Sequence, residues 1–172
     1  MKSLKYKPLS FEDLPLLYTW YHQPHVLRWY SKETMTFQQL ERKYRPYILG
    51  TNGIRGFICY YGSKPFGYIQ YYAVKDYPWA DHGLRQKLSL FAGLDAFIGE
   101  LSCIGKGLGK LMIERFIRRH VWKLYSYCVV DPHVSNKKAV GCYSSCGFSM
   151  HKKILSDEKE DHYLMVKKAS FA

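Results

Sequence analysis

The stretch Gly105-Lys106-Gly107-Leu108-Gly109-Lys110 decides the fold, because it lies between a strand-like run and an amphipathic helix pattern. Glycine lets the backbone approach a ligand closely, and the first turn of a helix directs free N–H groups outward. With Lys106 and Lys110 adding positive charge, the stretch predicts a cradle for a phosphate group. Its spacing is neither that of a Walker A loop nor that of a G-x-G-x-x-G dinucleotide loop. The alternative is a glycine-rich turn that binds nothing.

A second motif follows about thirty residues downstream and reads Asn136-x-x-Ala139-Val140-x-Cys142-Tyr143-x-x-x-Gly147-Phe148. The two motifs together resemble the acetyl-CoA signature of the GCN5-related N-acetyltransferases. In that superfamily a loop of the type Q/R-x-x-G-x-G/A precedes N-x-x-A-x-x-x-Y-x-x-x-G-F. Ile104 departs from the pattern, because the superfamily usually has Gln or Arg there. The loop binds chiefly through backbone N–H groups, so this side-chain change weakens the resemblance only mildly.

Four further stretches, which extend the resemblance over nearly the whole chain, look like the aminoglycoside 6′-N-acetyltransferase branch. They are His-Val-Leu-Arg-Trp-Tyr at 25–30, Gly-Leu-Asp-Ala-Phe-Ile-Gly-Glu at 93–100, Asp-Pro-His at 131–133 and Glu-Asp-His-Tyr-Leu-Met at 160–165. The resemblance implies an α+β fold in a single N-acetyltransferase domain over residues 1–172. Its central sheet is expected to be mixed, mostly antiparallel and flanked by helices.

The pattern of the chain agrees with alternating strands and helices. Strands are predicted at residues 4–8, 56–61, 65–74, 90–98, 124–130, 148–154 and 162–167. Helices are predicted after the Ser10/Asp13 pair, at 36–47 behind the Thr36/Gln39 capping box, at 107–121 and at 136–146 before Gly147. A loop is expected at residues 75–87.

Asp95 and Tyr143 are the residues to which the resemblance assigns catalysis. Tyr143 would protonate the departing CoA thiolate, since its reference pKa of about 10 keeps it protonated at neutral pH. Asp95 would receive the substrate ammonium and act as general base, or would anchor the ammonium while a water takes the proton. The alternatives are a core tyrosine and a hydrogen-bonded core aspartate.

Cofactor and substrate contacts also follow from the resemblance. The pyrophosphate of CoA would lie on the backbone of the glycine loop, and N–H groups at about 95–97 would polarise the thioester carbonyl. The expected cofactor-binding residues are Phe97, Ile98, Ile104, Gly105, Lys106, Gly107, Gly109, Lys110, Asn136 and Ala139. The expected substrate-binding residues are Trp29, Tyr30, Trp79, Asp95, Asp131, Glu160 and Asp161. Alternatives are packing for the tryptophans, a helix cap for Asp131, and a solvated charge run at 157–161.

The composition of the chain limits which other classes of function are possible. Apolar residues make up 47% of the 172 residues and the formal net charge is +12. No apolar run approaches the roughly 18 residues of a membrane helix and no signal region is present, so we expect a cytoplasmic protein. The five cysteines lack metal-site spacing, and Pro24 keeps His22 and His25 off one helix face, so no metal is expected.

The expected function is transfer of an acetyl group from acetyl-CoA to the 6′-amine of an aminoglycoside, directly through a ternary complex. The alternatives are a small-amine, siderophore or ribosomal-protein N-acetyltransferase on the same fold, and a non-catalytic CoA- or nucleic-acid-binding module. The acceptor would be a polycationic amine, and the protein a monomer or homodimer without specific nucleic-acid or membrane binding.

Overall fold

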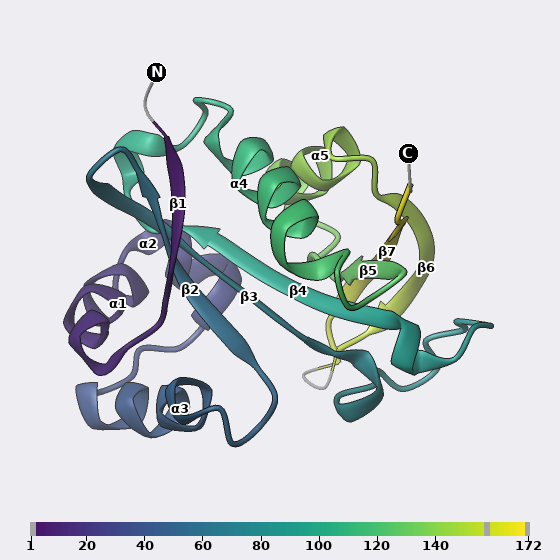
Figure 1. Ribbon diagram of the computed structural model, residues 1–172, viewed down its shortest axis with the longest axis horizontal. Helices are drawn as coiled ribbons and strands as arrows, with labels where there is room; N and C mark the ends of the chain where they lie inside the picture. The colour runs from purple at the N-terminus through teal and green to yellow at the C-terminus, as the bar shows by residue number, and fades with distance from the viewer. Residues whose placement is uncertain (1–2, 157–158, 171–172) are drawn as a thin grey trace. The chain divides into compact units, whose positions relative to one another are not determined.

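The computed structural model describes residues 3–156 and 159–170 (Figure 1). Hydrogen bonds join seven strands in the order β1-β2-β3-β4-β5-β7-β6. The strands are β1 (Leu4–Pro8), β2 (Arg55–Tyr61), β3 (Lys64–Ala73), β4 (Phe91–Ile98), β5 (Tyr127–Val130), β6 (Ser149–Leu155) and β7 (Asp161–Lys168). The helices are α1 (Leu14–Tyr21), α2 (Pro24–Val26), α3 (Phe37–Leu49), α4 (Leu108–Phe116) and α5 (Lys137–Ser145). The predicted α+β class is confirmed.

The sheet is mixed, as predicted. β4 and β5 are parallel, whereas β1 and β2, β5 and β7, and β6 and β7 are antiparallel. The parallel ladder ends at the pair Gly93–Val129, while β4 continues to Ile98. The chain divides into two compact units, which we call the first unit (residues 3–70 and 95–112) and the second unit (the described part of 71–94 and 113–170).

The first unit packs α1 and α3 against β2 and β3 around a core rich in tyrosine. The helix starts predicted from the Ser10/Asp13 pair and from the Thr36/Gln39 pair are confirmed. The Ser10/Asp13 capping box precedes a short 3₁₀ turn that leads into α1. Thr36 caps α3, because its Oγ1 accepts a hydrogen bond from the Gln39 N–H at 3.2 Å while the Gln39 side chain accepts from the Thr36 N–H at 2.7 Å.

The second unit is built on β5, β7 and β6, which lie side by side (Figure 1). Its core contains Val74, Phe91, Val129, Ile154 and Leu164. Partly buried residues of the loop at 75–87, among them Trp79 and Leu84, pack against this core. Gly147 ends α5 with a φ of 84°, the left-handed conformation that the sequence predicts there.

Two predicted boundaries differ from the structure by more than two residues. The prediction that the fifth strand begins at residue 124 is wrong, because Leu124 is 66% exposed and its N–H donates to the Val121 carbonyl in a turn. The α-helix predicted to reach residue 121 ends at Phe116 and continues to Val121 as a π-helical turn. None of the described helices is long and apolar enough to cross a bilayer.

Candidate active site

The glycine loop of the first unit has a backbone conformation that favours glycine at two positions. Gly105 and Gly107 have φ angles of 76° and 73°, which residues with a Cβ rarely adopt. A Cβ added at either position would meet no atom within 4 Å, so the backbone conformation and not crowding requires glycine there. α4 begins at Leu108, and the N–H groups of its first turn have no partners within the helix. The loop therefore fits an anionic group, as the sequence predicts.

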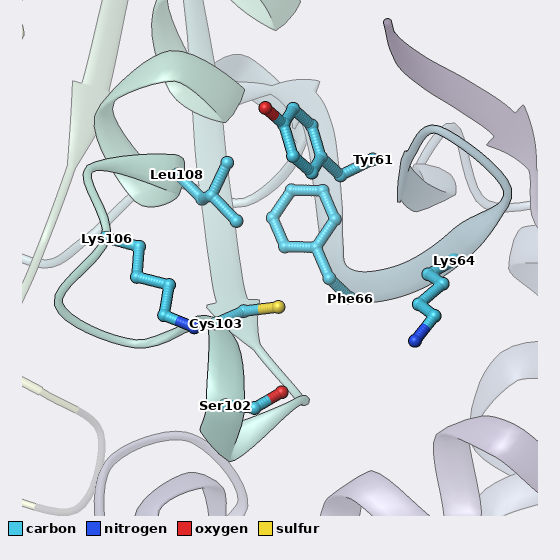
Figure 2. Close-up of a pocket in the computed structure, with 7 residues that line it drawn as sticks. All are labelled: Tyr61, Lys64, Phe66, Ser102, Cys103, Lys106 and Leu108. Carbon is cyan, nitrogen blue, oxygen red and sulfur yellow. The ribbon is translucent and has the colours of Figure 1, made fainter. Parts of the chain in front are cut away.

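A cavity of about 210 Å³ opens beside this loop (Figure 2). Lys106 comes from the loop itself, and Lys64 from the start of β3. The remaining lining residues are Tyr61, Phe66, Ser102, Cys103 and Leu108. Two ammonium groups beside mostly apolar walls suit a ligand that carries both negative charge and an apolar portion. This cavity lies wholly within the first unit.

Asp95 lies on β4, also in the first unit, and is half-buried. The Gln70 amide donates a hydrogen bond to Asp95 Oδ2 at 2.7 Å, and Gln70 Oε1 accepts one from the Tyr68 hydroxyl at 2.8 Å. Gln70 is only 6% exposed, so this chain of hydrogen bonds orients the carboxylate from inside the protein. Asp95 is thus a hydrogen-bonded carboxylate that is still partly open to solvent.

Aromatic rings surround this part of β4. Phe97, which shares a strand face with Asp95, lies 4.6 Å from the Tyr30 ring and 5.9 Å from the Tyr21 ring between centroids. Burial raises the pKa of Tyr30 and Tyr68 well above the usual value, and the Asp95 carboxylate raises it further. These phenols therefore stay neutral and provide hydrogen-bonding walls without acting as bases. Tyr30 belongs to this cluster.

Trp29 has a different environment from its neighbour Tyr30. The Arg28 guanidinium stacks over the Trp29 ring at 4.7 Å. This cation–π contact gives Trp29 a partner within its own short helical segment, Leu27–Ser31. A role for Trp29 in substrate binding stays a prediction.

Tyr143 lies in the second unit, on α5, and is 8% exposed. Its ring meets that of Phe148 edge-on at 5.6 Å. Asn136 caps the same helix, since its Oδ1 accepts a hydrogen bond from the Ala139 N–H at 3.2 Å. The motif therefore has a local structural role, and the contacts of Asn136, Ala139 and Tyr143 with a cofactor stay predictions.

A polar group of the second unit gathers around Asp131. The Trp79 indole N–H donates to Asp131 Oδ2 at 2.9 Å. His162 Nδ1 donates to the Asp131 carbonyl oxygen, and His162 Nε2 lies 3.9 Å from Glu160 Oε2. Trp79 is thus hydrogen-bonded to Asp131, and the His162 ring lies 3.9 Å from a carboxylate oxygen of Asp131 on one side and of Glu160 on the other. Asp161 instead forms an ion pair with Lys153 at 2.6 Å.

Residues 157 and 158 of the predicted charge run at 157–161 lie outside the described residues, so the structure describes only residues 159–161 of that run. Within residues 3–156 and 159–170, no three His, Cys, Asp or Glu side chains are arranged to hold a metal ion. The five cysteines are all free thiols.

Sequence reasoning missed several residues that the structure places at these sites. Gln70 had a readable signal, since it is a lone amide in the middle of a strand of apolar and aromatic residues. Lys43 gave no clear signal, because it is an exposed residue of α3 and its partner Tyr21 is 22 residues away. His162 gave no signal apart from its position next to Asp161, because its partner Asp131 is 31 residues away.

The mixed sheet, the glycine loop before α4 and the hydrogen-bonded carboxylate of Asp95 are features expected of an enzyme of the acetyltransferase class. A family profile described as acetyltransferase (GNAT) domain matches residues 10–155. The chain therefore belongs to this family of acetyltransferases.

Individual proteins that are similar to this chain include acetyltransferases for aminoglycosides and for spermidine. The chain is 25% identical over 182 aligned residues to an aminoglycoside N(6′)-acetyltransferase type 1 of Klebsiella pneumoniae, covering 98% of this chain and 85% of that protein. It superposes on aminoglycoside acetyltransferase AAC(6′)-Ib, solved with paromomycin and acetyl-CoA, with a TM-score of 0.86, 22% identity and coverage of 96% and 93%. It superposes on a spermidine N-acetyltransferase of Vibrio cholerae, solved with CoA and spermine, with a TM-score of 0.76, 18% identity and coverage of 96% and 95%. Both superpositions establish the shared fold.

Proposed function

We propose that this protein transfers the acetyl group of acetyl-CoA to the 6′-amine of an aminoglycoside, directly within a ternary complex. The observation that carries the proposal is Asp95, a half-buried carboxylate oriented by a buried glutamine and set among neutral tyrosines. A module that only binds CoA has no use for such a carboxylate. An enzyme that must hold and deprotonate an amine does.

The first unit supports the cofactor half of the proposal. The loop N–H groups and those at the start of α4, with Lys106 and Lys110 beside them, would hold the pyrophosphate of acetyl-CoA. Bound acetyl-CoA supplies the thioester whose acetyl group is transferred. Backbone N–H groups near Phe97 would polarise its carbonyl, and Tyr143 would donate a proton to the departing thiolate. The fit of the loop to an anion supports the first of these roles.

Asp95 would receive the ammonium of the acceptor, and the proton would leave to Asp95 or to a water beside it. In the second unit, the carboxylates of Asp131 and Glu160 are candidates for binding ammonium groups, as the resemblance implies. The formal net charge of +12 does not oppose such binding. Exposed charges more than about 10 Å away are largely screened at physiological ionic strength, so nearby carboxylates determine the local potential.

The proposal is tested by measuring thiol release from acetyl-CoA with kanamycin as acceptor and spermidine as the competing candidate. We expect saturable turnover with kanamycin, loss of turnover in Asp95→Asn and a strong decrease in Tyr143→Phe. Asp76→Asn is the matched control, because Asp76 is exposed and already paired with Lys75. Turnover with spermidine alone would transfer the assignment to a polyamine acetyltransferase. Absence of turnover with both amines would refute the proposal.

A further inference from the structure

Lys43 places its ammonium against three tyrosine rings of the first unit. Nζ lies 5.3 Å from the ring centroid of Tyr21, 5.9 Å from that of Tyr30 and 5.7 Å from that of Tyr44. It also donates a hydrogen bond to the Tyr21 hydroxyl at 3.2 Å. We call Tyr21, Tyr30 and Tyr44 the tyrosine cage. Aromatic faces attract cations through their quadrupole, so the cage is an ammonium-binding arrangement.

The cage is held in place independently of Lys43. The hydroxyl groups of Tyr21 and Tyr44 are hydrogen-bonded to each other, and their rings meet edge-on at 6.0 Å. Tyr21 is 1% exposed and Tyr44 is fully buried. Tyr30 is fixed from the other side by its contact with Phe97. The rings would therefore keep their positions if the lysine side chain moved away.

The site of the Lys43 ammonium also lies within the field of Asp95. Burial among the rings lowers the pKa of Lys43, whereas the Asp95 carboxylate raises it. The same carboxylate raises the pKa of Tyr21 and Tyr30. The residue Lys43 as a whole is exposed on α3, so its side chain can turn into solvent without any movement of the helix. The cage thus holds a removable ammonium near the carboxylate that would receive the acceptor.

We propose that the tyrosine cage binds a primary ammonium group of the acceptor, and that Lys43 occupies this site until the acceptor displaces it. This proposal rests on the proposed function, which identifies the acceptor as an aminoglycoside. Two ammonium groups cannot share the cage, because like charges at contact repel strongly where water is excluded. Lys43 would therefore compete with every acceptor and weaken its binding.

Lys43→Met tests the competition, since methionine keeps an unbranched apolar side chain and removes the charge. The dissociation constant of kanamycin for the CoA-bound protein is measured by calorimetry. A cation–π site of ordinary strength predicts tighter binding by about threefold to thirtyfold in the variant. Arg42→Met is the matched control, because Arg42 is an exposed residue of the same helix and carries the same charge.

The measurement is repeated in 0.5 M salt to separate the cage from the overall charge of the protein. A gain in affinity for kanamycin that persists in 0.5 M salt in Lys43→Met and is absent in Arg42→Met supports the proposal. Salt screens charges at a distance much more than it screens the direct competition of two ammonium groups for one site. An equal gain in both variants would show a general charge effect and overturn it. Unchanged or weaker binding by Lys43→Met would overturn it as well.

A second experiment needs no acetyl transfer and is therefore independent of the proposed function. Butylammonium, a single primary ammonium on an apolar chain, is titrated while the tyrosine ring signals are followed by NMR. We expect saturable shifts of the cage signals in Lys43→Met, weaker shifts in the wild-type protein, and loss of saturation when Tyr30→Leu is added to Lys43→Met. Absence of binding to Lys43→Met would refute the cage as an ammonium site, whether or not kanamycin is acetylated.

Discussion

Replacement of Gln70 by leucine removes the hydrogen bond that orients Asp95 while keeping a side chain of similar volume. The bond from the Gln70 amide to Asp95 Oδ2 measures 2.7 Å, and Gln70 is 6% exposed, so water has little access to replace it. A hydrogen bond to a charged group contributes about 1.5–3 kcal/mol. If the orientation of Asp95 is needed in the transition state, kcat/KM should decrease by about 10-fold to 150-fold.

The variant should also be less stable. The Tyr68 hydroxyl is buried and donates to Gln70 Oε1, so leucine leaves it without its acceptor. Loss of a partner by a buried donor costs about 1–3 kcal/mol of the free energy of unfolding. Tyr68→Phe is the control, because it removes the hydroxyl at the far end of Gln70 and keeps the bond to Asp95.

The assay is steady-state thiol release with kanamycin and acetyl-CoA, together with urea unfolding of each variant. We expect Gln70→Leu to lose kcat/KM for kanamycin and to keep its KM for acetyl-CoA, because the glycine loop is untouched. Tyr68→Phe should lose stability but less than threefold in kcat/KM. A Gln70→Leu protein that unfolds more easily yet keeps kcat/KM within threefold of wild type would refute the positioning role of Gln70.

Three further predictions concern stability. Asp13→Ala should lower the free energy of unfolding in urea by about 2–3 kcal/mol. The buried Asp13 carboxylate accepts hydrogen bonds at 2.8–2.9 Å from the backbone N–H and the hydroxyl of Ser10 and from the Lys7 ammonium. A loss below about 0.5 kcal/mol would contradict the capping role. Gly99→Ala should cost about 1–3 kcal/mol, because its Cβ would lie 2.1 Å from the ring of the buried Trp20. Gly141→Ala, in a helix with open space around it, is the control and should be neutral or stabilising. Burial and two nearby cations lower the pKa of His120, so the unfolded chain takes up the proton first as the pH falls below about 6.5. The contribution of His120 to stability is therefore complete above that pH and decreases below it. His120→Phe should reduce the acid-side loss in urea midpoints between pH 5 and 7.5, and parallel profiles would argue against it.

The sequence predicted the features whose causes are local. The two capping boxes, the glycine loop and Gly147 are all recognisable, because helix starts, helix ends and positive φ angles depend on residues within one turn of each other. The strand prediction was wrong at residue 124 because it, too, relied on local composition alone. Apolar composition there resembles a strand, but the chain is still completing the turn that follows the π-helical segment.

Only the tertiary structure decided which side chains meet. Gln70 reaches Asp95 across 25 residues, Lys43 reaches Tyr21 across 22, and Trp79 reaches Asp131 across 52. The sequence named Asp95, Tyr30, Trp79 and Asp131 by resemblance, but it gave no sign of the partners that orient them. Their contacts depend on strand register and on helix packing against the sheet, which are set by burial of the whole core and not by any short pattern.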